Sequence, residues 1–154
     1  MAALGEQFGN ATHLDVLLAL MQKAIDLAST QQPDIDAIRE LGAGWVAEET
    51  LAIAIYYALK YANDFDKALI AAVNHDGDSD STGAVTGNIL GTYLGMDEIP
   101  AKYIDHLELK SIILEIADDL YHDCQMTEYG SHYGEVWVRK YIYCTYAPTS
   151  VAGA

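Results

Sequence analysis

The chain has 154 residues, of which 51% are hydrophobic, and this length suits a single domain over residues 1–154 with a sizeable core. Its 23 acidic residues outnumber 8 basic residues, which gives a formal net charge of -15. Such a charge repels phosphate backbones and anionic lipids, so the composition argues against nucleic acid and against a membrane surface as partners.

Apolar residues recur at helical spacing in seven segments along the chain. In chain order these are residues 13–29, 35–41, 46–61, 65–74, 82–94, 99–106 and 109–122. Residues 1–10 precede them as an aperiodic lead-in, and Thr12 is placed to cap the first helix. The segment 46–61 is apolar nearly all round, which predicts a central position. The sequence therefore predicts an all-α fold, an orthogonal helical bundle.

Glycine recurs every four residues in the fifth of these segments, at Gly83, Gly87, Gly91 and Gly95. An interior glycine costs a helix about 1 kcal/mol relative to alanine, so the repetition calls for a packing reason. A spacing of four places the glycines close to one face, which another helix can approach at short range. We therefore predict that this helix is buried and that its N-terminus is rigidly held.

The C-terminal tail is aromatic and departs from the helical pattern after residue 123. Its aromatic residues include Tyr129, Tyr133, Trp137, Tyr141, Tyr143 and Tyr146. Residues 136–146 have the composition of a strand but no evident partner strand. We expect an extended or irregular tail that lies over the helices.

An acidic turn at Asp76, Asp78 and Asp80 concentrates more potential ligands than any other stretch. Crowded carboxylates repel one another unless a cation or protons neutralise them. Nearly all the potential metal-ligand atoms here are oxygens, which favours Mg²⁺, Mn²⁺ or Ca²⁺ over Zn²⁺. An EF-hand does not fit, because Ser81 and Gly87 stand where its glycine and bidentate acid are required. The remaining alternative to a metal site is a solvated acidic turn that caps a helix.

Three residues near the start of the segment 46–61 have both a functional and a structural interpretation. Trp45 follows Gly44 and could stack on a nucleobase, or it could anchor the helix in the core. Glu48 and Glu49 lie in the first helical turn, where the helix dipole favours acids. The functional alternative is that one of the two glutamates points into a site.

The cysteines and the N-terminus bear on the cellular compartment. Cys124 and Cys144 show no CxxC spacing, so neither a disulfide framework nor a thiolate zinc site is indicated. Residues 1–10 lack a basic segment followed by an apolar core, and no apolar run reaches the roughly 20 residues that span a bilayer. We expect a cytoplasmic protein.

Several short motifs together resemble the C-terminal half of the ADP-ribosylglycohydrolase family. They are GWVAEE at residues 44–49, GDSDST at 77–82, GAVTG at 83–87 and Ile-Pro at 99–100. The resemblance extends over about residues 41–121, and GDSDST is its most specific part.

The resemblance implies a fold, a metal cofactor and a reaction. In that family an all-helical fold holds two Mg²⁺ ions, which bind ADP-ribosyl substrates and activate water. The water cleaves the bond that links ADP-ribose to a modified side chain. By position, the resemblance implies that Asp78, Asp80 and Ser81 are metal ligands. Trp45 and Glu48 are the candidate substrate-binding residues, and no catalytic residue is identified.

Two features depart from the family pattern. The family's N-terminal Thr-Asp-Asp metal motif, its GDALG-like segment and its upstream acidic residue are not recognisable here, and Asp76 replaces a small residue. Half of the metal ligands are therefore missing, as in a fragment, a split subunit or a reduced family member. We expect a homo-oligomer or a completing chain, since a half bundle exposes apolar surface. The alternative function is a non-catalytic ADP-ribose-binding or assembly module.

Overall fold

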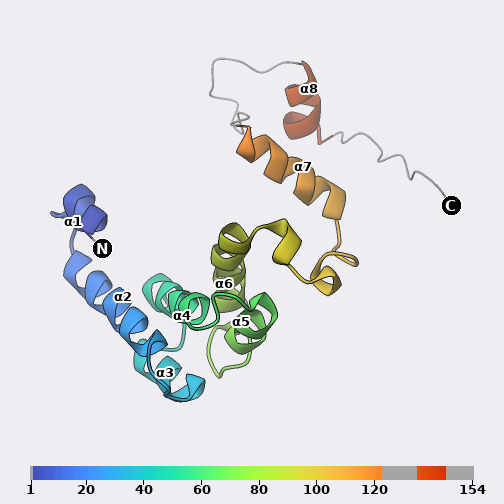
Figure 1. Cartoon of the computed structure of the whole chain (residues 1–154). Helices are drawn as coiled ribbons and strands as arrows, with labels where there is room; N and C mark the ends of the chain where they lie inside the picture. Colours follow the sequence, from blue (N-terminus) through green and yellow to red (C-terminus); the bar gives the residue numbers. More distant parts are fainter. Residues whose placement is uncertain (1, 123–134, 145–154) are drawn as a thin grey trace. The chain divides into compact units, whose positions relative to one another are not determined.

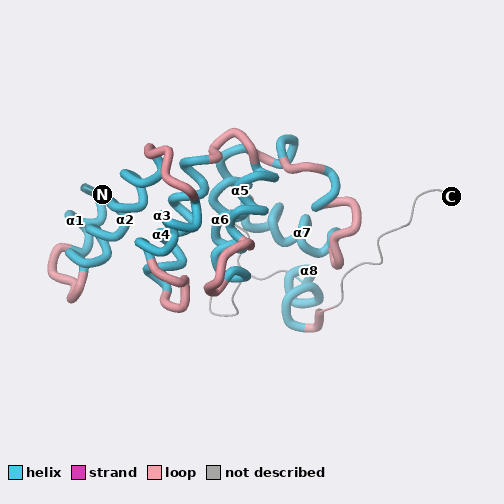
Figure 2. Tube along the Cα trace, turned by 90° about the horizontal axis from the view of Figure 1, so that it is seen from below, coloured by secondary structure: helices cyan, strands magenta, loops and turns pink. Residues whose placement is uncertain are grey.

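The computed structural model describes residues 2–122 and 135–144, which are helical and contain no strand (Figure 1 and Figure 2). This confirms the predicted all-α class. The chain divides into two compact units, residues 1–101 and residues 102–154. Whether all 154 residues act as one domain stays a prediction.

The first unit holds the helices that carry the predicted site. Its elements are α1 (Ala2–Phe8), α2 (Leu14–Ala28), α3 (Asp34–Leu41), α4 (Ala47–Lys60), α5 (Phe65–Ala72), α6 (Ser79–Leu94) and the 3-10 turn η1 (Met96–Glu98). A further 3-10 turn, η2 (Ala101–Tyr103), follows at the boundary between the units. The first three predicted helices agree with α2, α3 and α4 to within one residue at each end.

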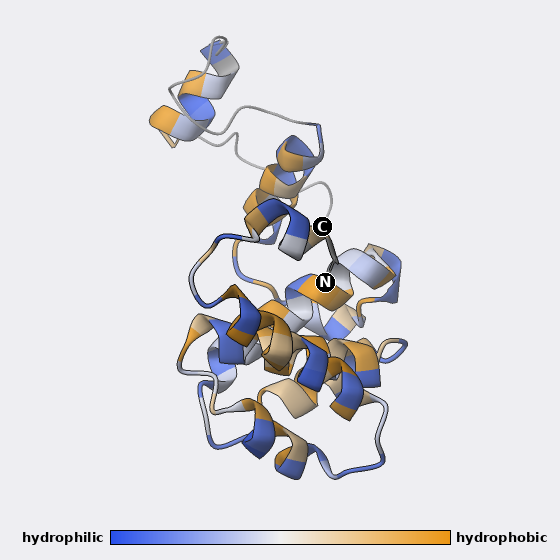
Figure 3. Ribbon diagram, turned by 90° about the vertical axis from the view of Figure 1, so that its left-hand side faces the viewer, coloured by the Kyte–Doolittle hydropathy of each residue, from blue (hydrophilic) through white to orange (hydrophobic). Residues whose placement is uncertain are grey.

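Helix α4 is the centre of this unit, as its nearly continuous apolar surface predicts. It packs against α2, α3, α5 and α6, which surround it in Figure 1. Ile53, Tyr56 and Tyr57 of α4 are at most 1% exposed, and they form the core with residues of α2 and α3. Hydrophobic and hydrophilic stretches alternate along the helices in Figure 3, as in amphipathic helices that share one core.

The glycines of α6 differ in what they contact. Gly83 is buried where α6 meets α5, and a Cβ atom there would lie 2.5 Å from Cγ1 of Val73. At Gly87 and Gly91 the corresponding Cβ would make ordinary contacts of 3.8 and 3.7 Å. Gly95 follows the helix and has a φ of 82°. Of the glycine face, only Gly83 is buried and needs the close approach, whereas Gly87, Gly91 and Gly95 are half-buried.

Four local expectations for the first unit were wrong. Residues 2–8 form α1 instead of an aperiodic lead-in, and His13, with a φ of 65° and no side-chain cap, replaces Thr12 before α2. Helix α6 starts three residues early, at Ser79, because Asp80 in its first turn interacts favourably with the helix dipole. Residues 99–106 form no α-helix, and the 3-10 turns η1 and η2 flank Pro100 instead.

The second unit contains α7 (Lys110–Tyr121), α8 (Glu135–Trp137) and the π-helical turn η3 (Val138–Ile142). The expected extended tail is therefore wrong over residues 135–142. Arg139 pairs with Glu135 one turn away at 2.8 Å, and such pairs favour a helix. Lys140 pairs with Glu115 of α7 at 2.7 Å and also binds Asp119 of α7. Ion pairs of Lys140 thus hold residues 135–142 against α7.

Some expectations fall outside the described residues. These are Cys124, Tyr129, Tyr133 and Tyr146. Cys144 is an exposed free thiol. Over residues 2–122 and 135–144, none of the helices combines the length and the apolar character that crossing a bilayer requires.

Candidate metal site

The predicted metal ligands lie together at the N-terminus of α6. Asp78 is the residue before the helix, and Asp80 and Ser81 belong to its first turn. The Asp80 side chain is exposed, whereas Asp78 and Ser81 are half-buried. A hydrogen bond with the Asp78 carboxyl group, together with the N–H groups of Ser81 and of Asp80 itself, lowers the pKa of Asp80. The turn therefore holds Asp80 as a carboxylate.

His75 supports the turn from inside the unit. Gly77 N–H donates to Nδ1 of His75 at 3.1 Å, so Nε2 carries the ring proton and donates it to Oγ1 of Thr82 at 2.8 Å. The Thr82 hydroxyl in turn donates to the Ala72 carbonyl at 2.8 Å. Burial lowers the pKa of His75 and outweighs the opposite effect of Asp76 and Asp78. The neutral ring is a structural brace.

The turn also rests against the loop that precedes α4. Asp78 N–H donates to the Ala43 carbonyl at 2.8 Å. Gly77 lies so close that a Cβ atom would be 1.8 Å from the same carbonyl oxygen, so only glycine fits there. A Cβ at Gly44 would lie 3.6 Å from Cβ of Asp78. The two loops thus fix each other's backbone.

Glu49 holds this second loop in place. Its carboxylate accepts the N–H groups of Ala43 at 3.1 Å and Gly44 at 3.0 Å. The Thr50 hydroxyl donates to the Gly44 carbonyl at 2.7 Å. Sequence reasoning chose Glu48 as the candidate instead, because two adjacent acids in a first helical turn look alike. Nothing local in the sequence distinguishes Glu49 from Glu48 in this role, which depends on the fold of the loop.

The candidate substrate-binding residues are both accessible. Trp45 is 71% exposed, so the interpretation of Trp45 as a core anchor is wrong. It directly follows Gly44, whose Cα faces Asp78. The Glu48 side chain is exposed in the first helical turn after the same loop. A role in substrate binding stays a prediction for both residues.

The donor chemistry of the turn fits a hard divalent cation. Asp78 and Asp80 bring two interacting carboxyl groups and Ser81 a hydroxyl, and oxygen ligands are those that Mg²⁺ prefers. Within residues 2–122 and 135–144, no three His, Cys, Asp or Glu side chains converge to hold a metal ion. Mg²⁺ takes about six ligands, so these three residues would supply only part of a coordination shell.

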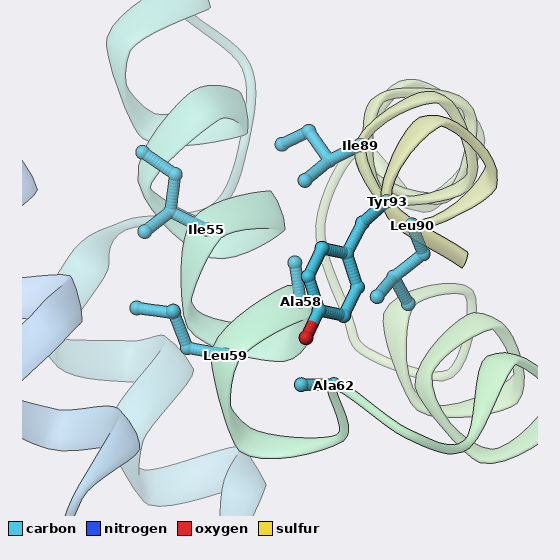
Figure 4. A pocket seen from close by; sticks show the side chains of 7 residues that line it. All are labelled: Ile55, Ala58, Leu59, Ala62, Ile89, Leu90 and Tyr93. Carbon is cyan, nitrogen blue, oxygen red and sulfur yellow. The ribbon is translucent and has the colours of Figure 1, made fainter. Parts of the chain in front are cut away.

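The apolar cavity of the first unit lies elsewhere. It has a volume of about 320 Å³ and is formed by α4, the turn after it and α6 (Figure 4). Figure 4 shows Ile55, Ala58 and Leu59 facing Ile89, Leu90 and Tyr93. None of the predicted metal ligands lines it. The cavity is therefore separate from the candidate metal site.

Known proteins resemble this chain over part of their length. It is 31% identical over 68 residues to an ADP-ribosyl-[dinitrogen reductase] glycohydrolase of Rhodospirillum rubrum, covering 44% of this chain and 22% of the relative. It is 30% identical over 89 residues to the human ADP-ribosylhydrolase ARH3, covering 51% and 24%. It is 33% identical over 87 residues to the ADP-ribosylarginine hydrolase Tri1 of Serratia proteamaculans, covering 56% and 23%.

The chain thus spans less than a quarter of the length of these curated relatives. No solved structure matches it. The family model for ADP-ribosylglycohydrolase matches residues 2–130, which is most of the chain. The chain therefore belongs to the ADP-ribosylglycohydrolase family.

Proposed function

We propose that the chain takes part in the Mg²⁺-dependent hydrolysis of the glycosidic bond between ADP-ribose and a modified side chain. The observation that carries this proposal is the pair of acidic residues, Asp78 and Asp80, at the N-terminus of α6, in a turn whose backbone is held by His75 and by the Ala43 carbonyl. Family membership supports the reaction class, and the names of the three relatives supply the ADP-ribosyl group. The cytoplasm stays the expected compartment.

In this proposal the residues of the chain divide the work. Asp78, Asp80 and Ser81 hold one side of the metal centre, and Mg²⁺, when bound, supplies the positive charge that activates water. The exposed Trp45 offers its ring to the adenine base, and stacking of this kind is worth about 1–3 kcal/mol per base. Glu48 is placed to accept hydrogen bonds from hydroxyl groups of the substrate.

The remaining metal ligands must come from other residues. The chain covers under a quarter of its relatives and shows no third acidic ligand among the described residues. We propose that a second copy or a completing chain supplies them.

The deciding experiment measures ADP-ribose release from an ADP-ribosylated arginine substrate, with and without Mg²⁺. We expect release that requires Mg²⁺ and that falls by more than about 100-fold in Asp80→Ala, because losing only an outer-shell partner already costs up to that much. Absence of metal-dependent release would remove an enzymatic role of this chain by itself.

Calorimetry with ADP-ribose separates the alternatives if no release is seen. Binding that Asp80→Ala weakens, without turnover, would support a non-catalytic ADP-ribose-binding module. No binding at all would leave an assembly role. A melting temperature that does not rise with Mg²⁺ would indicate that the acidic turn is only a helix cap.

A further inference from the structure

Glu49 is joined to Asp78 by an unbroken path of hydrogen bonds through one peptide unit. The Glu49 carboxylate accepts the Gly44 N–H at 3.0 Å, and the carbonyl of the same peptide unit, that of Ala43, accepts the Asp78 N–H at 2.8 Å. The same carboxylate oxygen also accepts the Ala43 N–H, from the preceding peptide unit, at 3.1 Å. Glu49 thus lies on one side of the loop and Asp78 on the other.

The fit around this path leaves little room for displacement. A Cβ at Gly42, where φ is 125°, would lie 2.3 Å from Cδ of Glu49, so the glutamate occupies the space that a side chain would take. On the far side, Gly77 approaches the Ala43 carbonyl closely, as described above. Because the Glu49 side chain borders the loop on one side and the Gly77 backbone borders it on the other, we expect a shift of the loop to displace Asp78, which follows Gly77.

Resting on the proposed function, we propose that Glu49 is a positioning residue, which sets the place of Asp78 as a metal ligand through the peptide that joins Ala43 and Gly44. Its carboxylate does not contact the metal in this proposal. Hydrogen bonds to a charged acceptor are stronger than those to a neutral one, so a carboxylate holds the two loop N–H groups better than an amide does. Glu49 therefore affects the position and the rigidity of the metal ligand Asp78.

A metal-independent test measures amide hydrogen exchange of Asp78 by NMR in the full chain. In Glu49→Ala we expect exchange at this amide to accelerate at least about tenfold, since its acceptor is no longer held. Glu49→Gln keeps an acceptor oxygen and should fall between wild type and Glu49→Ala. Amides in the middle of α4 should keep their protection in both variants, which distinguishes a local effect from unfolding. Unchanged Asp78 exchange in Glu49→Ala would overturn the inference.

A second readout measures the dissociation constant for Mn²⁺ alone by electron paramagnetic resonance. We expect binding to weaken about tenfold or more in Glu49→Ala and less in Glu49→Gln. Glu98→Gln, an exposed change in η1 that removes the same charge, is the matched control and should bind as wild type does.

The two readouts keep separate failures apart. Equal Mn²⁺ affinity in wild type and Glu49→Ala would contradict the positioning role. Wild-type protein that binds no Mn²⁺ would instead contradict the metal site of the proposed function. The exchange rate of the Asp78 amide would then decide the role of Glu49 by itself.

Discussion

Asp34, the first residue of α3, collects three partners from α4 and the residue after it. Its carboxylate accepts the hydroxyl groups of Tyr56 at 2.8 Å and Tyr61 at 2.7 Å, and it pairs with Lys60 at 2.8 Å. Burial raises the pKa of Asp34, but hydrogen bonds from Lys60, Tyr61 and Tyr56 outweigh it and hold the pKa below its usual value of 3.8. One charged side chain thus fastens α3 to α4.

This network predicts a particular dependence of stability on pH. A carboxyl group whose pKa is lower in the folded state stabilises the protein above its unfolded pKa, near 3.8, and loses that contribution as pH falls through the folded pKa. Asp34→Asn should lower the free energy of unfolding by about 2 kcal/mol at pH 7. Urea titrations should show this difference shrinking below pH 3.8.

Asp36→Asn is the matched control, because Asp36 lies on the same helix in an exposed pair with Arg39. Such pairs contribute at most about 1 kcal/mol, so this variant should follow wild type closely at every pH. A constant difference between wild type and Asp34→Asn down to the lowest pH would contradict the assignment.

At the scale of the element, helix α6 contains one glycine that is required by close packing and others that are not. Val73 crowds Gly83, whereas the neighbours of Gly87 and Gly91 leave room for a methyl group. Helix propensity favours alanine at all interior positions by about 1 kcal/mol. Whether alanine raises or lowers the free energy of unfolding should therefore depend on what each glycine contacts and not on helix propensity alone.

We expect Gly87→Ala to raise the free energy of unfolding by up to about 1 kcal/mol and Gly83→Ala to lower it by about 1–2 kcal/mol. Thermal melts followed by circular dichroism at 222 nm, the usual helix signal, measure both. Adding Val73→Ala to Gly83→Ala should recover part of the loss, because it removes the atom that the new Cβ meets. Equal effects at the two glycines would show that packing does not distinguish them.

At the scale of the whole molecule, exposed apolar surface and net charge have opposite effects on self-association. Leu59 is 51% exposed and Tyr93 is 68% exposed in the first unit, and such surface favours association. The net charge of -15 repels a second copy. Salt screens charges that lie beyond the Debye length, about 10 Å at 0.1 M, but leaves apolar contacts in place.

We therefore expect the purified chain to self-associate in sedimentation velocity experiments, more strongly at higher protein concentration and at higher salt. Salt should matter because it weakens the repulsion between acidic surfaces. A compact monomer at every protein and salt concentration would contradict the expected oligomer.

Local signals in the sequence determined the class of fold and the place of the candidate ligands. Apolar spacing located α2, α3 and α4 to within one residue, and the crowding of Asp78 and Asp80 marked the candidate metal turn. These features depend on neighbours within a few residues, so they are readable from the sequence.

Only the tertiary structure decided which residues support that turn. Ala43 and Asp78 are distant in sequence, and their contact requires a glycine at 77 and a carboxylate at 49 that nothing local distinguishes from its neighbours. The structure likewise showed that Trp45 is exposed and is not a core residue. Exposure depends on which side chains the other helices cover, so the local sequence does not reveal it. The sequence by itself thus pointed to the candidate ligands, and packing between distant segments identified Glu49 and His75 as the residues that hold their turn.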